Sequence, residues 1–287
     1  MKKKGILLAA VLLLDTAGLV QAQDEALGVT LDATWVSKYL WYGFDLLDDK
    51  AAFQPSVDVD LFGSGFSVNV WASYPTSAGD MNKTAAAPAG ASRIDATEYD
   101  YTLAYNAVIC EGEAHATDVT AQYAYYDFID TYDEAADAYE LGVQLAWPNL
   151  CPTGNVTPSY YVGKIWPAAG SAGTNSAGVA KADLSNSYAG WIHIFGVGYD
   201  LKMPGLTANT PEQVFTFGVQ AVYNDGFADV AGTVDHDWSH ALFSVSTEVE
   251  LAENVSLTPA LYYQSSWDDS VNSEDETWLS IGASCRF

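Results

Sequence analysis

The densest group of side chains that could do chemistry is the segment 235–240, which reads Asp-His-Asp-Trp-Ser-His. Serine, histidine and aspartate are the residue types of a hydrolase triad, and histidine with aspartate can also hold a divalent metal. Neighbours on a strand point to opposite faces, so His236 and Ser239 would point apart if the segment is extended. An acidic surface loop is therefore the favoured interpretation, and no catalytic residue, resident metal or cofactor is predicted.

Carboxylates are the other chemically active side chains, and they greatly outnumber the lysines and arginines. The 287 residues include 37 Asp and Glu against 11 Lys and Arg, which gives a formal net charge of -26. Neutralising phosphates needs clustered Lys and Arg, so this balance excludes a nucleic-acid partner. The 13% aromatic content is too high for a disordered acidic chain. A folded framework must therefore position these carboxylates.

Alternation with period two, which indicates β-strands, runs through most of the chain after Gly28. The last segment is the clearest, because Leu279 and Ile281 share one face, Ser280 and Gly282 the other, and the chain ends on Phe287. About twelve segments alternate in this way, each near the length that a tilted spanning strand needs: 29–44, 53–62, 65–74, 96–108, 115–128, 137–147, 155–166, 188–201, 212–224, 237–251, 254–266 and 277–287.

The connections between these segments alternate in length. Short ones, such as Gly63-Ser64 and Ala252-Glu253, follow the even-numbered segments, and longer polar ones such as 75–95 and 168–187 follow most odd-numbered ones. Bacterial outer-membrane barrels have short periplasmic turns and long external loops. The sequence therefore predicts an all-β fold, a transmembrane antiparallel up-and-down β-barrel of about 12 strands in the outer membrane of a Gram-negative bacterium.

The N-terminus has the layout of a secretory signal peptide. Three lysines at positions 2–4 precede an apolar run over 6–14, and Val20-Gln21-Ala22 supplies small residues for cleavage. We expect residues 1–22 to be the signal peptide and 23–287 to form the barrel.

In a membrane barrel the polar face of each strand lines the lumen. Nine carboxylates against two cations would give the lumen a negative potential, which favours cations. The alternative is that side chains fill so narrow a barrel and that some carboxylates lie solvated at its rims. The residues predicted to line the lumen are Asp32, Lys38, Asp58, Asp60, Glu98, Asp100, Asp118, Glu140, Glu248, Glu250 and Arg286.

Aromatic residues have a simpler predicted role. Tyr and Trp prefer the membrane interface, where the ring is in an apolar layer and the polar tip is in water. Trp71 and Trp278 fall on the lumen side. The residues predicted on outer faces are Tyr39, Trp41, Tyr74, Tyr125, Trp147, Tyr161, Trp191, Tyr199, Tyr223 and Tyr263.

Three cysteines, Cys110, Cys151 and Cys285, are too far apart in the chain for a metal-binding cluster. Cys110 and Cys151 fall in two turns at the same end of the predicted barrel. The sequence allows two alternatives, a disulfide between Cys110 and Cys151 or two free thiols.

Residues near the start of the chain also carry a family resemblance. They are Ser37-Lys38-Tyr39-Leu40-Trp41-Tyr42-Gly43-Phe44, Gln54-Pro55-Ser56-Val57-Asp58, Gly65 and Val70-Trp71-Ala72-Ser73. The stretch Val29 to Tyr74 resembles the start of the TorF-like porins of the outer membrane, in which an Arg typically stands where this chain has Tyr42. The resemblance implies an outer-membrane channel and adds no catalytic residue.

The sequence thus predicts a porin-like, cation-preferring channel for passive diffusion of small solutes, and not an enzyme. The expected partners are outer-membrane lipid and lipopolysaccharide, the small solutes or cations themselves, and the barrel-assembly machinery through the strand that ends at Phe287. The alternatives are a non-conducting structural or adhesive barrel whose acidic loops bind divalent cations, a barrel-embedded hydrolase that uses His236, Ser239 or His240, and a soluble secreted β-protein.

Overall fold

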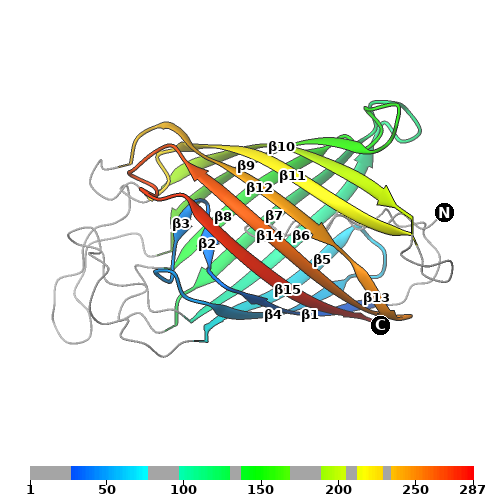
Figure 1. Cartoon of the computed structure of the whole chain (residues 1–287), viewed down its shortest axis with the longest axis horizontal. Helices are drawn as coiled ribbons and strands as arrows, with labels where there is room; N and C mark the ends of the chain where they lie inside the picture. The colour runs from blue at the N-terminus through cyan, green and yellow to red at the C-terminus, as the bar shows by residue number, and fades with distance from the viewer. Residues whose placement is uncertain (1–26, 77–96, 130–136, 169–188, 205–211, 229–233) are drawn as a thin grey trace.

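The computed structural model describes residues 27–76, 97–129, 137–168, 189–204, 212–228 and 234–287. The predicted signal peptide lies outside these residues. Twelve strands form the wall of a closed antiparallel barrel (Figure 1), and no helix in the described part is long and apolar enough to cross a bilayer. The wall strands are β1 (Gly28–Val36), β4 (Ala52–Asp60), β5 (Phe66–Pro75), β6 (Glu98–Ile109), β7 (Thr117–Asp127), β8 (Ala138–Ala146), β9 (Val156–Pro167), β10 (Gly190–Met203), β11 (Gln213–Asp225), β12 (Asp237–Thr247), β14 (Val255–Ser266) and β15 (Glu276–Arg286).

Closure comes from pairing of the first strand with the last. β1 pairs with β15 from Thr30 opposite Arg286 to Val36 opposite Ser280, and every other wall strand pairs with its neighbours in the chain. The short β13 (Val249–Ala252) follows β12 after a break at Glu248 and also pairs with β14. Among the described strands, each wall strand is paired on both sides, which a barrel in lipid requires. The predicted fold is therefore confirmed.

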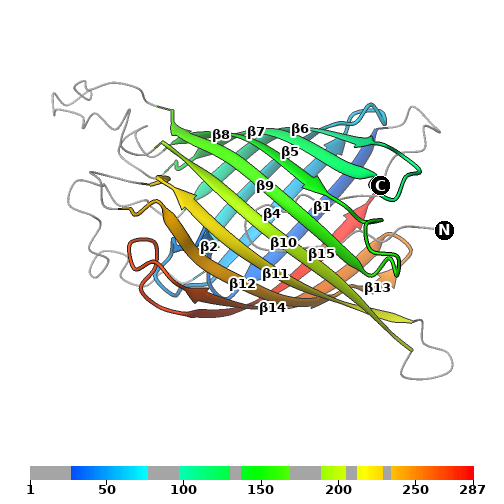
Figure 2. The same cartoon turned by 90° about the horizontal axis from the view of Figure 1, so that it is seen from above.

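The first predicted segment, 29–44, is wrong in its second half. β1 ends at Val36, and residues 37–51 leave the wall and fold into the barrel, where they form the small hairpin β2 (Leu40–Trp41) and β3 (Phe44–Asp45). We call residues 37–51 the inner hairpin. Figures 1 and 2 show it inside one end of the barrel. The other predicted segments overlap the strands, with ends that differ by a few residues.

Apolar side chains cover the outside of the wall. On β7, Tyr123 is 44% exposed while its neighbour Gln122 is buried, and the same alternation repeats around the barrel. Exposed outward residues include Leu31, Val57, Val70, Leu103, Leu141, Val143, Phe195, Val197, Val219, Phe243, Leu261, Leu279 and Ile281. An apolar exterior on a closed barrel is a lipid-facing surface, so the protein is an outer-membrane barrel and not a soluble β-protein.

An aromatic belt surrounds much of the wall near the end that carries the long connections. Successive rings lie 5.1 to 6.2 Å apart in the pairs Tyr74–Tyr99, Tyr101–Tyr125, Tyr125–Tyr139, Tyr139–Trp166 and Tyr223–Trp238. Such a belt marks the membrane–water interface. By the topology of bacterial barrels this is the outer end, and the end with the short connections 61–65, 110–116 and 147–155 faces the periplasm.

The lumen differs between its two ends. In the outer half the inward side chains are buried, among them Gln122, Ile165, Ile192, Val222, Gln264 and Trp278. In the periplasmic half many inward side chains are half-exposed, among them Asp32, Asp58, Asn69, Asp118, Asp200, Thr216 and Ser284, although Ser246 and Thr258 are buried. Water therefore reaches the periplasmic half of the lumen, whereas protein fills the outer half.

Candidate channel constriction

The inner hairpin turns tightly at Tyr42 and Gly43. Both residues have positive φ, 48° and 94°, as the two central residues of a type I′ turn require. Asp45 then accepts hydrogen bonds from the backbone N–H groups of Leu47 at 3.1 Å and Asp49 at 2.6 Å, which shapes the return of the chain. Local turn chemistry therefore gives the hairpin its shape, independently of the wall strands.

Aromatic packing holds the tip of the inner hairpin against the wall. Phe227, which follows β11, lies 5.1 Å from the Trp41 ring, 5.8 Å from the Tyr42 ring and 5.9 Å from the Phe44 ring. The Trp41 ring also meets Tyr126 of β7 edge-on at 5.1 Å. These rings form one buried cluster that crosses the lumen, so the inner hairpin acts as a plug of the outer half.

Glu140 of β8 is the polar anchor beneath this plug. It is fully buried, and the hydroxyls of Tyr42, Tyr126 and Tyr161 all donate hydrogen bonds to its carboxylate, the first at 2.7 Å. Gly163 makes this approach possible, because a Cβ there would collide with Glu140 and with the Tyr161 hydroxyl. One carboxylate thus joins the inner hairpin to β7 and β9.

A second carboxylate, two strands along the wall from β8, also holds the hairpin. The Tyr39 hydroxyl donates to Glu98 Oε2 at 2.9 Å, and the Tyr39 ring lies 5.8 Å from Trp71 of β5. Asp100 is the next inward residue of β6 after Glu98. The inner hairpin is therefore bound through tyrosine–carboxylate hydrogen bonds to β6 and to β8, on one side of the lumen.

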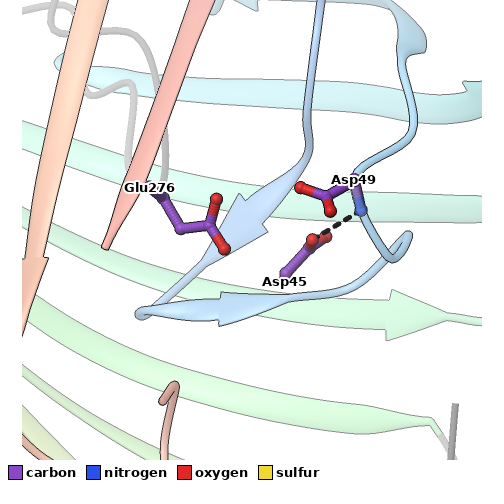
Figure 3. A group of neighbouring side chains, drawn as sticks. All are labelled: Asp45, Asp49 and Glu276. Carbon is purple, nitrogen blue, oxygen red and sulfur yellow. Dashed lines mark hydrogen bonds between the residues drawn. The ribbon is translucent and has the colours of Figure 1, made fainter. Parts of the chain in front are cut away.

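An ion cluster fixes the base of the inner hairpin. Asp45, Asp49 and Glu276 converge from the hairpin and from the start of β15 (Figure 3). The Lys38 ammonium lies 2.6 Å from Glu276 Oε2 and also pairs with Asp49, so lysine supplies the cation of this cluster.

Burial and charge act together on the titratable groups of this cluster. Burial alone would lower the pKa of Lys38, but the hydrogen bonds that its ammonium donates to Asp49 and Glu276 outweigh burial and raise that pKa above its ordinary value. Burial raises the pKa of Asp45, and the backbone donors oppose that effect. The cluster is an ion pair that ties the inner hairpin to β15.

The predicted lumen residues separate into three groups in the structure. Glu98, Asp100 and Glu140 lie around the plug, while Asp32, Asp58, Asp60 and Asp118 lie in the half-exposed periplasmic part. The remaining carboxylates and the arginine lie near the periplasmic rim: Glu248, Glu250 and Arg286.

Lys38 lies on the inner hairpin inside the barrel, and not on the first wall strand as its predicted segment implies. It lies beyond the end of β1, because the chain leaves the wall at Ser37, whose N–H donates to Leu279 O at 2.9 Å. Three predicted outer aromatics are wrong. Tyr39 and Trp41 belong to the inner hairpin, and Tyr161 faces the lumen on β9, so all three are buried inside the barrel.

The segment 235–240 forms no triad among the described residues. A bulge opposite Val222 and Tyr223 buries Ser239 and His240 together, with Ser239 Oγ 3.0 Å from His240 Nδ1. His236 is exposed and pairs instead with Asp225. His240 faces Gly43 of the inner hairpin and lines a cavity of about 20 Å³, which has room for a single water.

The three cysteines are free in the structure. Cys110 is exposed, and Cys151 is half-exposed with its Sγ 3.2 Å from Thr153 Oγ1. The proposed disulfide between these two turns is therefore absent from this conformation.

Sequence reasoning missed the plug because it assigned Tyr39 and Trp41 to a lipid face. One signal was available: Tyr39-Leu40-Trp41-Tyr42 is a continuous apolar run, which indicates burial on both faces. Tyr126 and Phe227 carry no comparable local signal. Only the closed barrel brings them opposite the hairpin.

The turn of the inner hairpin has no room for a side chain at Gly43. A Cβ there would lie 2.7 Å from His240 Nδ1 and 3.0 Å from Val271 Cγ1, in a backbone conformation that already disfavours side chains. We expect Gly43→Ala to lower the free energy of unfolding by about 1–3 kcal/mol and to raise the conductance in planar bilayers. Gly112→Ala is the matched control, because Gly112 has φ +85° but nothing within 4 Å. Equal effects of both variants would contradict a seated hairpin.

Comparison with known proteins leaves the family open. No family model matches the chain, and no curated protein matches it. The resemblance to TorF-like porins is therefore not confirmed.

Solved structures do match in fold. An outer membrane channel from Pseudomonas putida F1 has a TM-score of 0.50 at 12% identity, over 91% of this chain and 95% of that chain. The NanC porin has a TM-score of 0.48 at 10% identity, over 90% and 98% of the two chains. The KdgM porin, solved with disordered oligogalacturonate, has a TM-score of 0.48 at 8% identity, over 90% and 99%. The likeness to the Pseudomonas channel is one of fold, an outer-membrane β-barrel.

Proposed function

We propose that the protein is an outer-membrane channel for small solutes, closed in this conformation by the inner hairpin and selective for cations. The observation that carries the proposal is the divided lumen. A half-exposed polar passage leads from the periplasmic end to a plug built from a connection between strands.

The way in which the plug is attached supports a gate. β2 and β3 pair only with each other and add no strand to the wall. At the tip, Gln264 Nε2 and Asn272 Nδ2 donate to Gly43 O at 3.0 and 3.3 Å. Side-chain contacts of this kind can break without opening the barrel, whereas a wall strand cannot leave without exposing unpaired backbone to lipid.

The charge of the open part supports the selectivity. Asp32, Asp58 and Asp118 face inward in the half-exposed region, and confined carboxylates raise the local concentration of cations. Because water reaches this region, the effect depends on salt and should weaken as ionic strength rises.

A reversal-potential measurement in planar bilayers under a salt gradient tests this proposal. We expect the wild type to favour cations, and the triple variant Asp32→Asn, Asp58→Asn, Asp118→Asn to lose most of that preference. Glu253→Gln is the matched control, because Glu253 is an exposed carboxylate in the turn before β14 and not on a wall strand. Anion preference in the wild type, or an equal shift in the control, would contradict the charge argument.

A second function is favoured by the filled outer half of the lumen. With the plug permanently seated, the protein would be a non-conducting structural or adhesive barrel. That function requires correctly folded wild type to show no conductance in planar bilayers at any voltage or salt concentration. Conductance events in the wild type would exclude it.

We further propose that the barrel-assembly machinery recognises β15 before the barrel closes. In the closed barrel the Phe287 N–H donates to Val29 O at 2.9 Å, so the end of the chain is part of the seam, while the Phe287 side chain is 73% exposed. Lipid and lipopolysaccharide would contact the apolar exterior and its aromatic belt.

A further inference from the structure

Glu98 and Asp100 form an unusual pair at the outer end of β6. Glu98 is 1% exposed, and only its Oε2 has a donor, the Tyr39 hydroxyl. Glu98 Oε1 and Asp100 Oδ1 are both buried without a hydrogen-bond partner. The two carboxyl groups are within hydrogen-bonding reach of each other. Since ionised carboxylates only accept hydrogen bonds, two carboxyl groups this close need a proton or a cation between them.

The described residues supply no such cation. On the inner hairpin, Lys38 is held by Asp49 and Glu276, and Lys50 lies 4.0 Å from Asp48. No ion pair joins Glu98 or Asp100 to a Lys, Arg or His of the described residues. If both groups are ionised, they need a cation from outside the described residues.

We propose that Glu98 and Asp100 bind one divalent metal cation, of the Ca²⁺ class, at the outer mouth of the constriction. Two carboxylates match its double charge, and their oxygens are the donors that hard cations prefer. Tyr39, hydrogen-bonded to Glu98, is a positioning residue. The cation would fix the part of the wall against which the inner hairpin packs. The existence of the metal site does not depend on the proposed channel function, but its role in the channel does.

Terbium luminescence tests the site directly in the folded, detergent-purified full chain. Tb³⁺ takes Ca²⁺ positions, and the Trp71 and Tyr39 rings, 5.8 Å apart beside the pair, would sensitise its emission. We expect sensitised emission in the wild type that added Ca²⁺ displaces. Glu98→Gln and Asp100→Asn should each weaken Ca²⁺ binding by about tenfold or more.

Asp32→Asn is the matched control, since it also removes one inward carboxylate but lies in the periplasmic half. It should leave the emission unchanged. Heat-modifiable migration in detergent gels verifies that each variant is folded, and Tyr39→Phe, which keeps a sensitising ring, should weaken binding less than Glu98→Gln.

Two results would overturn the proposal. Emission that is equal in the wild type, Glu98→Gln and Asp100→Asn would place the bound ions elsewhere. No emission from folded wild type at neutral pH would mean that a shared proton, and not a metal, lies between the carboxylates. Metal binding without conductance would support the metal site and contradict the channel function. Conductance without metal binding would support the channel function and contradict the metal site.

Discussion

Replacing residues 39–47 by a glycine–serine segment of equal length is expected to raise the single-channel conductance by about tenfold or more. The reason is that the Trp41, Tyr42 and Phe44 rings fill the outer half of the lumen, while the twelve wall strands pair without them. The measurement is single-channel recording in planar bilayers, with the wild type and the variant refolded in the same detergent.

A replacement of residues 111–115 by the same kind of segment is the control, since it alters an exposed connection between β6 and β7 and leaves the inner hairpin in place. It should leave the conductance close to that of the wild type. If the hairpin variant folds and still passes no current, the wall side chains themselves close the barrel and the gate proposal is wrong.

Glu140→Ala is expected to lower the free energy of unfolding by about 3 kcal/mol or more and to raise the conductance as well. The substitution leaves the hydroxyls of Tyr42, Tyr126 and Tyr161 buried without their common acceptor. It also removes the polar anchor of the inner hairpin. Unfolding in guanidinium from lipid vesicles measures the first effect, and bilayer recording the second.

Gln144→Ala provides the comparison, because Gln144 faces inward on the same strand and is half-exposed. It should change stability by less than about 1 kcal/mol. Glu140→Gln should lie between the two, since an amide oxygen still accepts from the tyrosines without the charge. Equal losses in Glu140→Ala and Gln144→Ala would show that the tyrosine cluster does not depend on its carboxylate.

The wall of this barrel was predictable because a spanning strand has a simple requirement. One face meets lipid and the other meets the lumen, so parity along each segment assigns the side of every residue. On β7 this rule separates Tyr123 from Gln122 correctly. The rule is local, and it holds wherever the chain stays in the wall.

The constriction was not predictable in the same way. Parity treats Glu98, Glu140 and Asp58 as equivalent inward carboxylates, yet the first two are buried against tyrosines and the third is half-exposed. The difference comes from a connection that folds back into the barrel and from partners far away in sequence, such as Tyr39 with Glu98. Alternation contains no information about such contacts.

The position of the inner hairpin in the chain has a consequence for the order of assembly. It connects β1 to β4, the first two wall strands, but its contacts lie on β7, β8 and β9 and on Phe227 after β11. The seat therefore does not exist until most of the later strands are in place. Contacts between segments so distant in sequence form late, because chain entropy opposes them. The nascent barrel must accordingly pass through a stage in which its wall is largely built and its lumen is still unobstructed from end to end.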